Sequence, residues 1–263
     1  MTDETVLTMA PRATPRHPFR AGLFGIGLEA YWAQFEGLEA RLRANLALVA
    51  SRLRICGAEI VEIGLVDTPE KALDAGHTLR REDVDVVFLY LTTYALSSTV
   101  LPVVQRARVP VILLNLAPAS RIDYARFNRL GDRTRMTAEW LAYCAACPAP
   151  EIANVLNRAG VPFHQVTGVL EQDPACWREI AEWVEAARAA HGLAHARIGL
   201  MGHYYGGMLD IYTDLTRMCS TFGSHMEIVE VDALSALRAA VPDSEIADRV
   251  AGFRRELAVQ DDC

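Results

Sequence analysis

The chain has 263 residues, of which 51% are hydrophobic and 22% are charged, and its mean hydropathy is +0.12. This composition excludes a disordered chain, a collagen-like fibre and a coiled coil. The net charge of −7 provides no basic surface for nucleic acid or for an acidic membrane, so neither is expected as a partner.

The beginning of the chain combines prolines and arginines without an apolar core. We therefore expect residues 1–19 to form a disordered arm rather than a signal peptide. The six cysteines are scattered, which predicts free thiols in a reducing cytoplasm. Residues 86–104 carry no charge, but several serines and threonines interrupt them, so a strand, a loop and a short helix are expected rather than a membrane span.

Strands and helices alternate through the first two thirds of the sequence. The expected strands are continuous apolar runs, as is typical of parallel strands covered by helices on both faces. Thr68, Pro69 and Glu70 have the order of a helix cap, a first helical residue and an acidic first turn. The pattern predicts a Rossmann-like open parallel α/β sheet with flanking helices. The expected strands cover residues 20–28, 58–66, 84–91, 109–116 and 161–168, and the clearest helices cover residues 33–53 and 174–191.

The strand–helix pattern restarts near residue 194. Only two strands are expected there, so both edges of their sheet would stay open. We therefore expect an N-terminal α/β domain at residues 20–192 and an incomplete second α/β domain at residues 193–263, with the chain stopping inside that domain. The expected elements are strands at residues 197–202 and 225–231 and helices at residues 208–222, 233–241 and 243–259.

A glycine pair lies at the end of the first expected strand. Gly25 and Gly27 lie where a dinucleotide-binding loop would begin, but position 30 is alanine and the third glycine is missing. Three bulky or acidic side chains follow the glycines, and they would crowd and repel a pyrophosphate. The loop is then either a tight turn or the wall of a ligand pocket. The side chains in question are Glu29, Tyr31 and Trp32.

Two cysteines have the spacing of a redox or metal pair. Cys144 and Cys147 lack a second pair, so a structural zinc site is not expected. A thioredoxin-type pair opens a helix after a strand, whereas this pair is expected to close a helix before Pro148. Two buried thiols are the favoured interpretation.

The turn that follows the sixth expected strand combines a histidine, two tyrosines and two glycines. His203 and Tyr204 are candidates for a ligand contact there, and a structural histidine is the alternative. Asp210 and Asp214 lie four apart on the expected helix, a spacing at which paired carboxylates serve acid–base chemistry or bind a metal. Both fall opposite the apolar stripe, so a face exposed to solvent or to an interface is the favoured interpretation.

The sequence resembles the L-arabinose/L-fucose isomerase superfamily. The matching stretches are GLFGIGLEAYW at residues 22–32, AACPAPEIANVLNR at residues 145–158, and RIGLMGHYYGGMLDIYTDL followed by FGSHMEIVEVDAL within residues 197–234. Members of this family interconvert aldoses and ketoses with a divalent metal, usually Mn²⁺, bound by two glutamates and two histidines. The resemblance implies that these ligands fall beyond this chain, so neither catalytic nor metal-binding residues are assigned.

The resemblance implies that this chain supplies part of the substrate-binding site. A small-molecule sugar would contact Glu29, Tyr31, Trp32, His203 and Tyr204, and Met208 matches a substrate-packing methionine. Cys144 and Cys147 fall where arabinose isomerases have polar contacts. The expected protein is the N-terminal portion of a sugar isomerase, inactive alone and a homo-oligomer in its complete form. A non-catalytic sugar-binding module and an inactive gene fragment are the alternatives.

Overall fold

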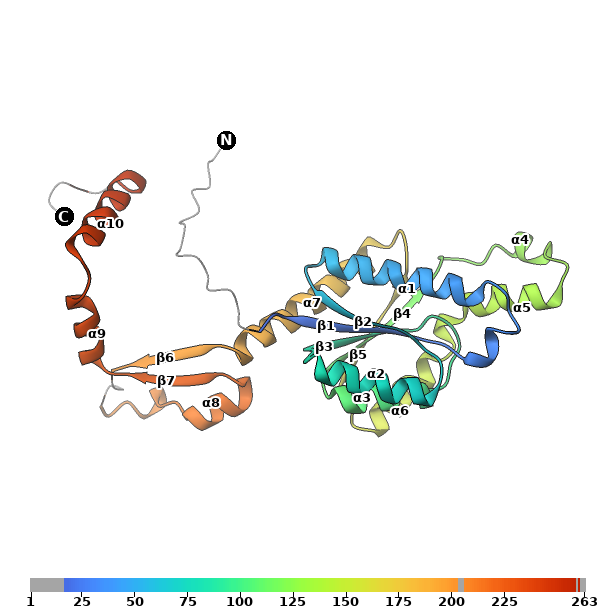
Figure 1. The fold of residues 1–263 in the computed structure, drawn as a ribbon, viewed down its shortest axis with the longest axis horizontal. Helices are drawn as coiled ribbons and strands as arrows, with labels where there is room; N and C mark the ends of the chain where they lie inside the picture. The colour runs from blue at the N-terminus through green and yellow to red at the C-terminus, as the bar shows by residue number, and fades with distance from the viewer. Residues whose placement is uncertain (1–16, 203–205, 259, 261–263) are drawn as a thin grey trace. The chain divides into compact units, whose positions relative to one another are not determined.

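The computed structural model describes residues 17–202, 206–258 and 260, and it divides the chain into two compact units, Met1–His191 and Gly192–Cys263. Unit 1 contains one sheet of five parallel strands, so the predicted Rossmann-like α/β class is confirmed (Figure 1). Across the sheet the strands are β2 (Glu59–Val66), β1 (Arg20–Ile26), β3 (Val86–Tyr90), β4 (Val111–Ala117) and β5 (Phe163–Val169).

Helices cover both faces of this sheet. Adjacent residues of one strand enter different cores, since Leu23 packs in one hydrophobic cluster and Phe24 in the other. This is why the strands are continuously apolar rather than alternating. One face carries α1 (Leu38–Ile55) and α7 (Pro174–Ala194), and the other carries α2 (Pro69–Arg81), α3 (Leu101–Ala107) and α6 (Ala149–Arg158) (Figure 1).

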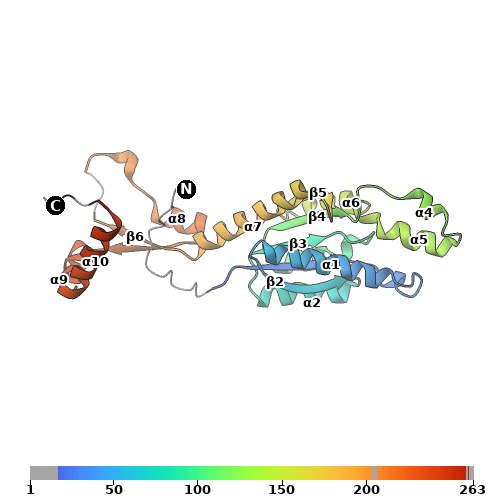
Figure 2. The same cartoon turned by 90° about the horizontal axis from the view of Figure 1, so that it is seen from above.

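Two further helices, α4 (Tyr124–Asn128) and α5 (Arg133–Ala142), extend beyond the carboxyl end of the strands (Figure 2). Three single turns of 3-10 helix complete unit 1, at Glu29–Tyr31, Ser97–Thr99 and Cys144–Ala146. The first turn follows β1, the second follows the loop at residues 91–96 after β3, and the third precedes α6.

Several expected boundaries in unit 1 are wrong. The helix expected from residue 33 begins at Leu38, because Gly37 adopts a left-handed φ of 79° that a helix cannot include. The break expected at Gly192 does not occur, and α7 continues to Ala194. A single glycine costs a helix only about 1 kcal/mol relative to alanine.

Unit 2 holds a parallel pair of strands, β6 (Arg197–Met201) and β7 (His225–Val229). The helix expected over residues 208–222 is wrong at its beginning. A 3-10 turn at Leu209–Ile211 ends at an extended Tyr212, and α8 (Leu215–Phe222) starts anew. The remaining helices are α9 (Val231–Ala239) and α10 (Asp243–Glu256).

No helix in the described part of the chain is long and apolar enough to cross a membrane.

Candidate functional site

The strand order of unit 1 defines where a ligand site is expected. The chain leaves β1 toward β2 on one side and then returns to β3 on the other side of β1. The connections after β1 and β3 therefore diverge, and open α/β sheets bind ligands outside the carboxyl ends of strands at such a switch point. The candidate site consists of the loops at residues 27–32 and 91–96.

The loop after β1 is fixed by a buried carboxylate at the end of β2. Asp67 is 3% exposed. The indole N–H of Trp32 donates to its Oδ2 at 2.8 Å, and the ammonium of Lys71 binds its Oδ1 at 2.6 Å. Trp32 is thus held by its polar edge while its ring stays partly exposed.

Burial by itself raises the pKa of Asp67, since it disfavours the charged carboxylate. The hydrogen bonds from Lys71 and Trp32 and the charge of Lys71 oppose this effect, and the net pKa of Asp67 is lowered. Asp67 is therefore ionised at neutral pH and acts as an anchor for both loop residues.

The loop at residues 27–32 does not offer free backbone N–H donors of Gly27 and Glu29 to a phosphate. The N–H of Gly27 donates to Val66 O at 2.9 Å and that of Glu29 to Asp67 O at 3.3 Å, so both donors are used within the sheet edge. A Cβ added at Gly27 would lie 2.7 Å from the Trp32 ring. Gly27 is small because the indole packs on it, which corresponds to the tight-turn alternative.

Two phenol rings lie at the switch point from opposite loops. Tyr31 is partly exposed and packs edge-on against Phe35, with ring centroids 5.7 Å apart. Tyr94, from the loop after β3, is 37% exposed. The pKa of Tyr31 is raised by burial and by its electrostatic interaction with Tyr94. Glu29 is exposed on the same turn as Tyr31.

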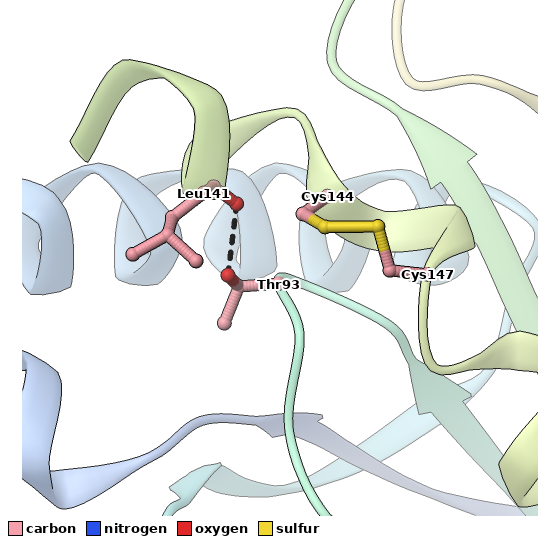
Figure 3. The surroundings of a disulfide bond; sticks show 4 residues. All are labelled: Thr93, Leu141, Cys144 and Cys147. Carbon is pink, nitrogen blue, oxygen red and sulfur yellow. Dashed lines mark hydrogen bonds between the residues drawn. A yellow bond between two sulfur atoms is a disulfide. The ribbon is translucent and has the colours of Figure 1, made fainter. Parts of the chain in front are cut away.

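Two buried threonines fix the loop after β3. The Thr92 hydroxyl donates to the Ile26 carbonyl, which ties this loop to the end of β1. The Thr93 hydroxyl donates to the Leu141 carbonyl at 2.8 Å, which ties it to the end of α5 (Figure 3). Both threonine side chains are at most 1% exposed. The loop that carries Tyr94 is therefore rigidly positioned.

The two cysteines of the CAAC sequence are joined in a disulfide beside this loop (Figure 3). The prediction of two free buried thiols is wrong for this pair. Cys144 is 3% exposed, whereas Cys147 is exposed. The pair was expected to close a helix, but it lies between α5 and α6, and Cys147 directly precedes the cap residue Pro148 of α6.

The remaining described cysteines, Cys56, Cys176 and Cys219, are free thiols, as the sequence predicts. Burial, together with Asp173 and Glu179, raises the pKa of Cys176 to about 11. Burial also raises the pKa of Cys56, with a smaller contribution from Glu185, and Arg188 opposes this effect. These two thiols are protonated at neutral pH and are poor nucleophiles.

The structure brings together only part of the predicted site. Glu29, Tyr31 and Trp32 lie at the carboxyl edge of unit 1, and the cysteine pair borders the neighbouring loop. Met208 belongs to unit 2 and is 46% exposed. His203 and Tyr204 lie outside the described residues. Their roles in binding stay predictions.

Asp210 and Asp214 do not share one helix as expected, but both are exposed, as the solvent-facing alternative predicts. Asp214 precedes α8 as its cap and accepts the N–H of Arg217 at 3.0 Å, whereas Asp210 lies in the separate 3-10 turn. Within residues 17–202, 206–258 and 260, no group of three or more His, Cys, Asp or Glu side chains could hold a metal ion.

Sequence reasoning missed Asp67, Thr92, Thr93 and Tyr94 as members of the site. All four follow directly on the ends of β2 and β3. Because carboxyl ends of parallel strands meet at one edge, their position after apolar runs is the signal that could have identified them.

Comparisons with known proteins do not give this chain a family. No family model matches it, and no curated protein matches it. A solved structure with similarity is a GDSL-like lipase from Bacteroides thetaiotaomicron, at 12% identity, covering 65% of this chain and 88% of that chain with a TM-score of 0.29. A likeness this weak supports no inference about activity.

These findings contradict the expected membership of the L-arabinose/L-fucose isomerase superfamily. The assignment to a sugar isomerase, and with it the role in sugar metabolism, is corrected. The resemblance rested on short stretches, and several of these form parts of the fold. GLFGIGLEAYW supplies a buried strand and the Gly27–Trp32 packing, and CPAPEIANVL supplies the first turns of α6. Such stretches share a pattern because open α/β sheets share their packing needs.

Proposed function

We propose that unit 1 is a small-molecule binding domain whose site lies at the carboxyl edge between β1 and β3, and that its ligand is a small organic cation. The observation that carries this proposal is the placement of Tyr31 and Tyr94, both partly exposed, on the loops that follow the neighbouring strands β1 and β3, with the exposed Glu29 on the same turn as Tyr31. Phenol rings present negative faces that attract an ammonium group. An adjacent carboxylate adds the opposite charge.

The surroundings support a preformed site. The Asp67 anchor holds the turn at Glu29–Tyr31 through Trp32, and the two buried threonine hydroxyls hold the loop that carries Tyr94. Rings that are already in place lose little conformational entropy when a ligand binds. The occupied N–H groups of Gly27 and Glu29 argue against a phosphate-bearing ligand at this loop.

The test uses choline as the probe and 3,3-dimethyl-1-butanol as its neutral isostere, both titrated into the full chain by calorimetry. Choline is expected to bind, and the neutral isostere is expected to bind several-fold more weakly, since only the cation gains from the ring faces and from Glu29. A cation–ring contact of about 0.5–2 kcal/mol corresponds to roughly a 2- to 30-fold change in affinity. Equal binding of the two compounds, or binding of neither, contradicts the proposal.

Variants locate the site. Tyr94→Ala is expected to weaken choline binding by the same 2- to 30-fold, roughly, and Glu29→Gln to weaken it with a loss of salt dependence. Tyr124→Ala is the matched control, because Tyr124 is a tyrosine of the same unit that is 66% exposed in α4. If Tyr124→Ala has the same effect as Tyr94→Ala, the binding is not at the switch point.

A further inference from the structure

We propose that Cys144 and Cys147 form a redox-active site that exchanges with dithiols, and that Cys147 is the sulfur that an external thiolate attacks. The site does not depend on the cation-binding function proposed above. Its substrate class is a thiol reductant, either a small dithiol or the dithiol of a partner protein. The two cysteines differ in exposure, and contacts of neighbouring side chains hold the segment that carries them.

The two cysteines have opposite environments. Cys144 lies in the turn Cys144–Ala146 and is 3% exposed, whereas Cys147 is exposed. Cys147 is therefore the residue of the pair that a thiolate approaching from solvent is expected to reach. Access is one of the factors that decide which sulfur of a disulfide is attacked.

Cys147 also lies at a helix start. It directly precedes Pro148, the cap residue of the ten-residue helix α6. Pro148 and Pro150 carry no N–H, so the start of α6 offers few donors to a sulfur, and the exposure of Cys147 is what distinguishes it from Cys144. Glu151 lies in the first turn of α6, where its carboxylate accepts hydrogen bonds from the backbone N–H and the hydroxyl of Ser97.

The surrounding segment is held without the disulfide. It crosses the carboxyl edge of the sheet, with Leu141 packed in the core on one face and Ala145 in the core on the other. The Thr93 hydroxyl fixes Leu141 through its carbonyl at 2.8 Å (Figure 3). Breaking the sulfur–sulfur bond therefore leaves the backbone in place, which is what a reversible cycle requires.

A structural role is the weaker explanation. The two cysteines are separated by three positions, so the bond closes a very short loop and constrains the unfolded chain little. Disulfides that mainly stabilise a fold link segments distant in sequence. Here the core contacts of Leu141 and Ala145 already stabilise the segment that carries the two cysteines.

The exchange balances in two steps. A thiolate of the dithiol attacks Sγ of Cys147, the bond between the two protein sulfurs breaks, and Cys144 leaves as a thiolate that takes up a proton. The second thiol of the reductant then attacks its own sulfur in the mixed disulfide and releases Cys147. Two electrons pass from the dithiol to the protein, and the reductant leaves as its cyclic disulfide.

The first experiment titrates the folded wild-type chain in mixtures of reduced and oxidised dithiothreitol and identifies modified cysteines by alkylation and mass spectrometry. Cys144 and Cys147 are expected to change together from unlabelled to labelled, and to return when oxidant is added. Tryptophan fluorescence checks that the chain stays folded. A pair that becomes reducible only on unfolding is structural, and a pair that stays reduced in excess oxidant is not a redox site. Either result overturns the proposal.

The second experiment identifies the entry sulfur with oxidised glutathione. Cys144→Ser leaves the exposed Cys147 and is expected to form a mixed disulfide at least about tenfold faster than Cys147→Ser, which leaves the buried Cys144. Cys219→Ser is the control and should keep the wild-type titration. Equal rates in the two single variants contradict the role of Cys147. If neither variant folds, the wild-type titration alone decides whether the pair is redox-active.

Discussion

Units 1 and 2 are built from the same strand–helix pattern but differ in what they bury. In the described part of the chain, every buried hydrophobic residue lies between Ala21 and Val184, in unit 1. Most large hydrophobic side chains that are exposed belong to unit 2, among them Ile228, Leu237 and Phe253. The comparison shows that amphipathic periodicity predicts elements, whereas a core requires layers on both faces of a sheet. Five strands provide those layers in unit 1, and two strands do not in unit 2.

The largest expected consequence concerns hydrogen exchange. In a monomeric sample, amides of β3 and β4 should exchange more slowly than those of β6 and β7 by orders of magnitude, because opening unit 1 exposes a large apolar core. Exchange rates followed by mass spectrometry or NMR check this. Equal protection of the two sheets would show that unit 2 is as stable as unit 1, and the comparison would fail.

Matched leucine truncations sharpen the same comparison. Leu89→Ala, in β3 at 0% exposure, should lower the free energy of unfolding by about 2–5 kcal/mol through lost burial and a cavity. Leu237→Ala, in α9 at 68% exposure, should change it by less than about 0.5 kcal/mol. All four tryptophans lie in unit 1, so fluorescence-monitored denaturation reads that unit. Exchange of the β7 amides provides the corresponding reading for unit 2.

The buried carboxylate of Asp67 in unit 1 makes a pH-dependent contribution to the free energy of unfolding. No charged residue of unit 2 is expected to contribute as much. Asp67→Asn should cost about 1–3 kcal/mol at pH 7, because it removes the charged acceptor of Lys71 and leaves buried polar atoms poorly paired. The pKa of Asp67 is lowered in the folded chain, so its stabilisation is present above the ordinary carboxyl pKa and is lost as the pH falls through the folded value.

The difference between the wild type and Asp67→Asn should therefore be full at pH 7 and shrink below about pH 4. Tryptophan-monitored unfolding at several pH values measures it. Glu59→Gln, an exposed partner of Arg20 in unit 1, is the control and should have little effect at any pH. If the difference in unfolding free energy between the wild type and Asp67→Asn stays constant down to pH 2, the charge of Asp67 does not contribute to stability.

Much of the fold could be predicted from the sequence, since the apolar runs of the five strands and the Thr68–Pro69 helix start have local causes. The site was less predictable. Trp32 was expected to contact a ligand, but its N–H is committed to Asp67, 35 positions away in sequence. The placement of Tyr31 and Tyr94 on the loops of neighbouring strands follows from the strand order, which periodicity does not encode. Local patterns also did not reveal that Asp214 caps a helix.

The smallest expected effect comes from two helix caps that share one geometry but lie in different units. The Thr68 hydroxyl accepts the N–H of Lys71 at 3.3 Å at the start of α2, and Asp214 accepts the N–H of Arg217 at 3.0 Å at the start of α8. Removing such a cap costs about 1 kcal/mol. The residues buried on α2, such as Leu79, belong to the unit 1 core, whereas α8 has no buried residue.

Thr68→Ala should therefore lower the tryptophan-monitored free energy of unfolding by about 1 kcal/mol, and Thr68→Ser should restore most of it. Asp214→Ala should leave that transition unchanged and instead accelerate amide exchange in α8 by roughly fivefold, the factor that corresponds to about 1 kcal/mol. The two results together would show that each cap stabilises only its own unit. If Asp214→Ala shifted the tryptophan transition as much as Thr68→Ala does, units 1 and 2 would unfold as one cooperative body, and the difference in burial between them would not translate into a difference in stability.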